Sequence, residues 1–60
     1  MPRSDDDAAA LWRAKAQDAR GQAARMIDSQ ARSTMLKIAQ SYEHLAEIAE
    51  RAAAARRHSP

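Results

Sequence analysis

The amino-acid sequence predicts an all-α fold, an antiparallel two-helix hairpin that dimerises into a four-helix bundle. Two observations predict the hairpin. Apolar or small residues recur in steps of three and four along residues 9–26 and again along 31–52, and the only plausible break lies around Ile27 and Asp28. A third observation predicts the dimer: several large apolar residues lie outside the stripes through which the two helices would pack.

The chain divides into an N-terminal tail over residues 1–4, a single hairpin over 5–58 and a C-terminal tail over 58–60. The first helix is expected over about 5–26. Ser4 can cap its start, and the three aspartates that follow suit the positive end of the helix dipole. The predicted hairpin therefore begins at the acidic run.

The first helix carries a continuous stripe of apolar or small residues. Its members are Ala9, Trp12, Ala16, Ala19, Ala23 and Met26. Gly21 lies on the opposite face, so the stripe passes it without a slip. We therefore interpret Gly21 as a tolerated helical glycine that costs about 1 kcal/mol, and not as a turn.

The turn is expected at about residues 27–28, because Asp28 and Ser29 are both favourable N-caps and the apolar phase shifts there. The second helix should run over about 29–57. Its stripe consists of Ala31, Met35, Ile38, Tyr42, Leu45, Ala49 and Ala52. A connection this short makes the two helices antiparallel neighbours.

Pairing the stripes about the turn sets small residues of the first helix against large residues of the second. Ala19, for example, should lie near Ile38, and Trp12 near Leu45. The predicted hairpin core is Trp12, Met35, Ile38, Tyr42 and Leu45.

Four further apolar residues flank this core without cover from the chain itself. They are Leu11, Ile27, Leu36 and Ile48, and we predict that they mediate self-association. A chain this short buries only about 60% of its unfolded surface, so a lone copy should be marginally stable. We therefore expect the chain to form a homodimer. The residues alone leave a higher oligomer, a monomer and a complex with another protein open.

Composition excludes several functions. Cysteine is absent, which removes disulfides and thiolate metal sites. The pattern holds no nucleophile beside a base and no glycine-rich phosphate loop, so we predict no enzyme, no catalytic residue and no cofactor. No apolar run is long enough to span a bilayer, and the first residues lack an apolar signal core. A cytoplasmic location is expected.

Polar side chains on one face of the second helix are candidate metal ligands. They are Gln40, Glu43, His44 and Glu47. Carboxylate-rich metal sites in helical bundles project inward, whereas this face points away from the predicted core. We therefore predict a solvent-exposed face with no metal, on which Glu47 pairs with Arg51.

The end of the second helix is basic and carries no acid. Its cationic residues are Arg51, Arg56, Arg57 and His58, which could bind the phosphates of nucleic acid or another anionic surface. The net charge is only +2, and no array of aromatic or amide side chains accompanies the arginines to read bases. Anion binding is therefore the alternative to our main prediction, a small non-enzymatic self-associating helical interaction module.

Three stretches, "LWRAKAQDAR", "MIDSQAR" and "TMLKIAQSYEHLAEIAERA", together resemble a group of short helical proteins common in alphaproteobacteria. The resemblance covers roughly Leu11 to Ala53 and departs at the turn, where members of the group have proline and this chain has Ser29. The resemblance implies a helical hairpin and no established activity.

Overall fold

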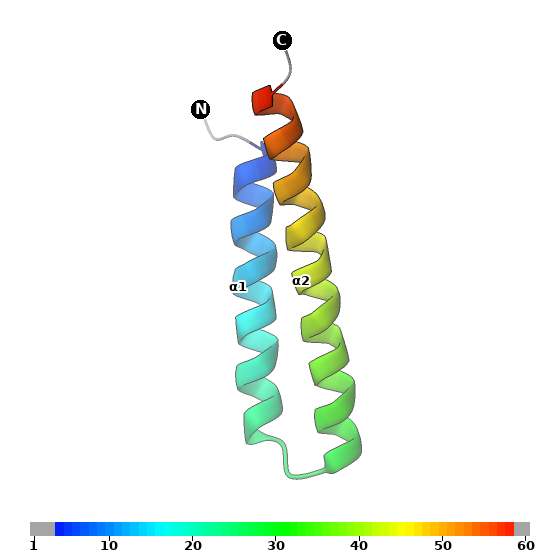
Figure 1. The fold of residues 1–60 in the computed structure, drawn as a ribbon. Helices are drawn as coiled ribbons and strands as arrows, with labels where there is room; N and C mark the ends of the chain where they lie inside the picture. The colour runs from blue at the N-terminus through cyan, green and yellow to red at the C-terminus, as the bar shows by residue number, and fades with distance from the viewer. Residues whose placement is uncertain (1–3, 59–60) are drawn as a thin grey trace.

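The structure is a computed structural model that describes residues 4–58, with the side chains of 7–57. Its two helices are α1 (Ser4–Arg25) and α2 (Ser29–His58). Figure 1 shows them lying side by side and antiparallel, joined at one end by the short segment 26–28. The protein is therefore an all-α helical hairpin.

The observed helix ends lie within one residue of the predicted ones, and α1 continues through Gly21 without a break. Of the predicted tails, residues 1–3 and 59–60 lie outside the described part of the chain, as do the side chains of Ser4 and His58.

Local hydrogen bonds explain where each helix stops or starts. The N–H of Met26 donates to the carbonyl of Ala23 at 3.1 Å, a tight turn that closes α1. At the start of α2, the N–H of Gln30 donates to Oδ1 of Asp28 at 3.2 Å. The N–H of Arg32 donates to the backbone carbonyl of Asp28 at 3.0 Å. Asp28 is therefore the N-cap of α2.

Alanine forms the interface between the two helices. Among the side chains that the structure describes, the buried ones are all alanines, each exposed by 6% or less: Ala9, Ala16, Ala19, Ala23, Ala39, Ala46 and Ala53. On α2 they recur at every seventh residue, so they form one stripe along the helix. Small side chains at a contact let helix axes approach closely, which leaves larger neighbours at the sides of the interface.

This interface corrects the predicted core. Ile38 and Leu45 were expected between the helices, yet they are 38% and 37% exposed, and the buried positions are the next residues, Ala39 and Ala46. Close packing through alanine turns α2 so that the branched side chains lie beside the contact instead of within it. Of the other predicted core residues, Trp12, Met35 and Tyr42 are half-buried.

Candidate interaction surfaces

The buried alanines of α2 have two different flanks. An α-helix turns about 100° per residue, so the residue three positions before a buried alanine lies about 60° to one side, and the residue immediately before it about 100° to the other. Relative to Ala46, Glu43 lies on the first side and Leu45 on the second. The same relation repeats seven residues earlier with Leu36 and Ile38.

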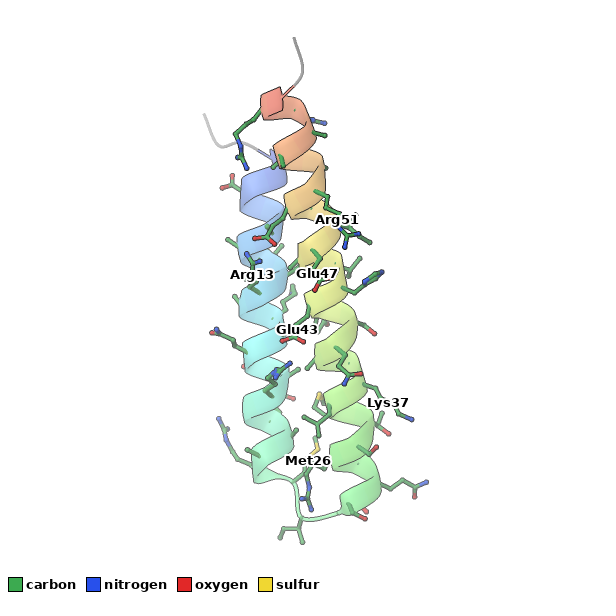
Figure 2. The ribbon with its side chains drawn as sticks, in the orientation of Figure 1. Arg13, Met26, Lys37, Glu43, Glu47 and Arg51 are labelled. Atoms are coloured by element: carbon green, nitrogen blue, oxygen red, sulfur yellow. The ribbon has the colours of Figure 1, made fainter. Side chains whose placement is uncertain are left out.

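Oppositely charged side chains from the two helices meet on the first side. Arg13 pairs with Glu50, and Arg20 pairs with Glu43, with each of these side chains roughly half exposed. Figure 2 shows Arg13 of α1 on the same side as the α2 glutamates Glu43 and Glu47. We call this surface the ionic flank, and it consists of Arg13, Arg20, Glu43, Glu47 and Glu50.

The electrostatics of the ionic flank are satisfied within the chain. The hydrogen bond from Arg13 to Glu50 raises the pKa of the Arg13 guanidinium, and the negative charges of Glu50 and Glu47 act in the same direction. Arginine is already protonated at any ordinary pH, so this shift gives the flank no pH switch. Because the pairs are exposed, solvent screens them, and each contributes little to the stability of the hairpin.

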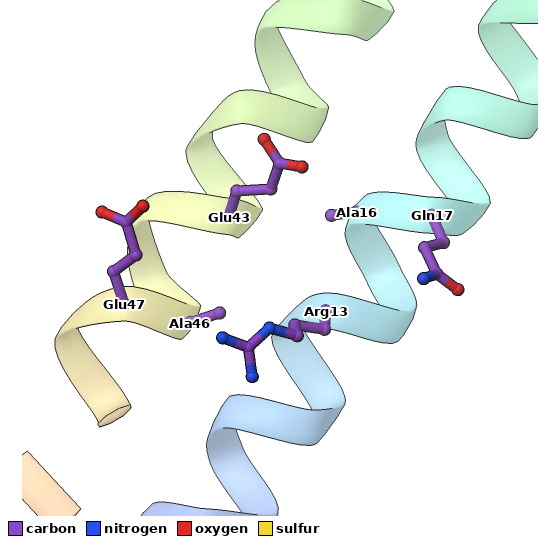
Figure 3. Close-up of a pocket in the computed structure, with 6 residues that line it drawn as sticks. All are labelled: Arg13, Ala16, Gln17, Glu43, Ala46 and Glu47. Carbon is purple, nitrogen blue, oxygen red and sulfur yellow. The ribbon is translucent and has the colours of Figure 1, made fainter. Parts of the chain in front are cut away.

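A surface hollow of about 410 Å³ lies on the ionic flank. It is lined by Arg13, Ala16, Gln17, Glu43, Ala46 and Glu47. Figure 3 shows the Arg13 guanidinium extending from α1 and the two carboxylates from α2, with the methyl groups of Ala16 and Ala46 between the helices. The polar groups of this lining are one guanidinium, one amide and two carboxylates, with no Ser, Thr, Cys or His among them.

The opposite side of the hairpin is apolar. Trp12 of α1 and Tyr42 of α2 stack there, with ring centroids 5.8 Å apart and planes 18° from parallel. Arg13, which follows Trp12, belongs to the ionic flank, and Leu11, which precedes it, lies on the other side of α1. We call this second surface the apolar flank, and it consists of Leu11, Trp12, Ile38, Tyr42, Leu45 and Ile48.

A second hollow, of about 240 Å³, extends the apolar flank toward the turn. Its lining consists of Lys15, Asp18, Ala19, Gln22, Met35, Ile38 and Tyr42. The α1 edge of this hollow is polar, with Lys15 and Asp18, whereas the α2 edge is apolar. Ala19 and Ile38, which the sequence placed near each other, both line it.

The four residues predicted to mediate self-association do not form one surface in the hairpin. Leu11 and Ile48 belong to the apolar flank, but Leu36 is 42% exposed on the ionic side, seven residues before Glu43. Ile27 lies in the connection between the helices and is 95% exposed. Both Leu36 and Ile27 are exposed, as expected of side chains that the chain itself leaves uncovered, and their part in self-association stays a prediction.

The basic end of α2 does not form a stripe. Arg51, Arg56 and Arg57 are all exposed, but their sequence separations place them about 100–140° apart around the helix axis. The side chain of His58, the fourth residue of the predicted anion site, lies outside the described residues. The arginines thus surround the end of the helix instead of lining one face.

The other candidate site of the sequence is the polar face of α2. His44 Nδ1 lies 4.0 Å from Glu47 Oε1, and both side chains are well exposed. Within the described part of the chain, no three His, Cys, Asp or Glu side chains lie close enough together to hold a metal ion. Neither helix, over the residues described, combines the length and apolar character needed to cross a bilayer.

The ion pairs across the helices were missed by the sequence reasoning, although the sequence contains their signal. Arg13 and Arg20 are seven residues apart on one helix, and Glu43 and Glu50 are seven apart on the other. Comparison with protein-family models, curated proteins and solved structures finds no match. The resemblance to short alphaproteobacterial proteins stays a prediction.

Proposed function

We propose that the protein is a small non-enzymatic self-associating helical interaction module, in which two copies pack through their apolar flanks into a four-helix bundle. The observation that supports this most strongly is the composition of the hairpin interface. Every buried side chain among those described is alanine, while Ile38, Leu45 and their large apolar neighbours stay exposed. The side chains with the most to gain from burial are those that the single chain leaves in water.

The energetics favour a partner on this flank. Full burial of a Leu, Ile or Met side chain contributes about 1.5–3 kcal/mol, and an alanine methyl much less. A chain of this length that buries mainly alanine has little surplus over the conformational entropy lost on folding. Covering the apolar flank adds the missing burial, and a second copy brings an equal apolar surface of its own.

The ionic flank is a poor alternative interface. Its arginines and glutamates would have to leave water together, and the desolvation of ion pairs offsets most of their attraction. On the apolar flank, Ile38, Leu45 and the stacked Trp12 and Tyr42 carry no charge, and the charged Lys15 and Asp18 lie only at its α1 edge. This difference in the cost of desolvation supports the apolar flank as the side through which two copies meet.

The test is the mass and the melting temperature of the purified protein at several concentrations. We expect a dimer by sedimentation equilibrium and a melting temperature that rises with concentration, because unfolding is then coupled to dissociation. A monomer whose melting temperature is independent of concentration would overturn the proposal. A defined higher oligomer would contradict the two-copy bundle.

A further inference from the structure

We infer that the two copies lie with their turns at opposite ends, so that Lys15 of each copy pairs with Asp18 of the other. This inference rests on the proposed self-association and adds its geometry. The two-fold axis crosses the apolar flank at the level midway between Lys15 and Asp18 on α1, which is also the level midway between Ile38 and Leu45 on α2.

The two edges of the apolar flank differ in chemistry. Along α2 the edge is apolar, because Ile38 and Leu45 lie on it. Along α1 the edge carries one cation and one anion, Lys15 and Asp18, three residues apart. Lys15 and Asp18 line the same hollow as Ile38, so the charged and the apolar parts lie side by side.

Two flanks can pack face to face by two-fold symmetry in two ways. If the turns lie at the same end, α1 of one copy covers α2 of the other, and Lys15 and Asp18 face Ile38. Charges buried against an aliphatic side chain without a partner are costly. If the turns lie at opposite ends, α1 covers α1 and α2 covers α2. The charged part of each α1 edge then faces the charged part of the other, and Ile38 and Leu45 face apolar residues.

The positions of the charges fit the second arrangement. An antiparallel pairing about a two-fold axis brings residue i of one copy to residue j of the other when the axis lies midway between them. For Lys15 and Asp18 this midpoint falls between residues 16 and 17, and for Ile38 and Leu45 it falls between 41 and 42. Lys15 and Asp18 line the same hollow as Tyr42, which borders the second midpoint, so both midpoints lie along this hollow.

A single position of the two-fold axis therefore produces favourable contacts along both edges. It makes two ion pairs between the copies on the α1 side and two Ile38–Leu45 contacts on the α2 side. Tyr42 lies beside this axis, and Trp12 stacks on Tyr42. Large aromatic side chains at the centre of an interface are where binding energy is usually concentrated.

The test mixes two full-length variants, Lys15→Asp and Asp18→Lys. Each variant alone sets like charges against each other across the axis, so each homodimer should dissociate about tenfold more readily than the wild type. In an equimolar mixture, the acidic chain should pair with the basic chain. Heterodimers should then make up well over half of all dimers, and half is the share expected from random pairing. The preference should fade in about 1 M salt.

The design separates contacts between copies from contacts within a chain. Within each variant, positions 15 and 18 carry the same sign, so recovery in the mixture cannot arise from a pair inside one helix. If the two variants pair at random while the wild type still dimerises, the opposed-turn geometry is wrong and the proposed self-association stands. A monomeric wild type would overturn the proposed function itself.

Disulfide trapping provides a second measurement, since the chain has no cysteine of its own. Ile38→Cys mixed with Leu45→Cys should form a disulfide-linked heterodimer under mild oxidation, because the two positions face each other across the axis. Leu45→Cys alone should not cross-link efficiently. Efficient cross-linking of Leu45→Cys to itself, or no heterodimer in the mixture, would contradict the position of the axis.

Discussion

The ionic and apolar flanks lie on either side of the same alanine interface, yet only one of them is complete within a single chain. On the ionic flank, Arg13 and Arg20 reach across to glutamates of α2. On the apolar flank, Trp12 and Tyr42 cover each other in part, while Ile38 and Leu45 remain more than a third exposed.

Two roles that one hydrophobic stripe usually combines are therefore separated in this hairpin: the alignment of the two helices and the burial of large apolar side chains. The alanines and the ion pairs set how close the two helices lie and how they are aligned, at little gain in buried apolar area. The large side chains, displaced to one side, are then available to a partner. In the proposed dimer, the surface through which the copies meet is thus already formed in the single hairpin.

The largest expected effect comes from placing a charge on each flank in turn. Leu45→Glu puts a carboxylate into the proposed interface of both copies, which should cost several kcal/mol and cause dissociation together with loss of helical circular dichroism. Leu36→Glu makes the same change on the ionic side at similar exposure and should alter stability by no more than about 0.5 kcal/mol. Sedimentation and thermal melts measure both. Equal stability of the two variants would break the distinction between the flanks.

An intermediate effect should follow from enlarging the alanine interface that separates the flanks. Ala46 is 1% exposed, so Ala46→Leu forces the helices apart and should cost about 1–3 kcal/mol. Ala14, on the exposed face of α1, provides the control, since Ala14→Leu has room for the added atoms. Thermal melts at one fixed concentration compare them. A melting temperature for Ala46→Leu at or above that of Ala14→Leu would contradict close packing through alanine.

The smallest effect is expected within the ionic flank. A double-mutant cycle on Arg20→Ala and Glu43→Ala should give a coupling energy of about 0.2–1 kcal/mol, because both side chains are nearly half exposed. The coupling should weaken as salt screens the pair, and the dimer mass should not change. A loss of self-association in either variant would show that this flank also contributes to the interface.

The sequence was sufficient to predict the helices and their turn, because their signals are local. Steps of three and four identify each helix, and Asp28 provides the cap that starts the second. The rotation of α2 about its own axis was not predictable in the same way. Ile38 and Leu45 repeat with the same period as Ala39 and Ala46, so periodicity fits both stripes equally well.

Choosing between these two stripes depends on the distance between the helices, which is a property of the folded pair. Hydrophobicity alone favours isoleucine and leucine, whereas close approach favours alanine. A sequence signal for the correct choice was present in the charges. Glu43 and Glu50 each lie three residues before a buried alanine, and each faces an arginine of α1. The apolar flank follows as the side that these ion pairs leave uncovered.

The most direct test of the account is the fluorescence of Trp12, the only tryptophan in the chain, as the protein is diluted. If a second copy covers the apolar flank, the emission maximum should be blue-shifted at high concentration and move to the red on dilution, in step with the fall from dimer to monomer mass. Emission that stays constant while the dimer dissociates would show that the copies meet through another surface and would contradict the role assigned to the apolar flank.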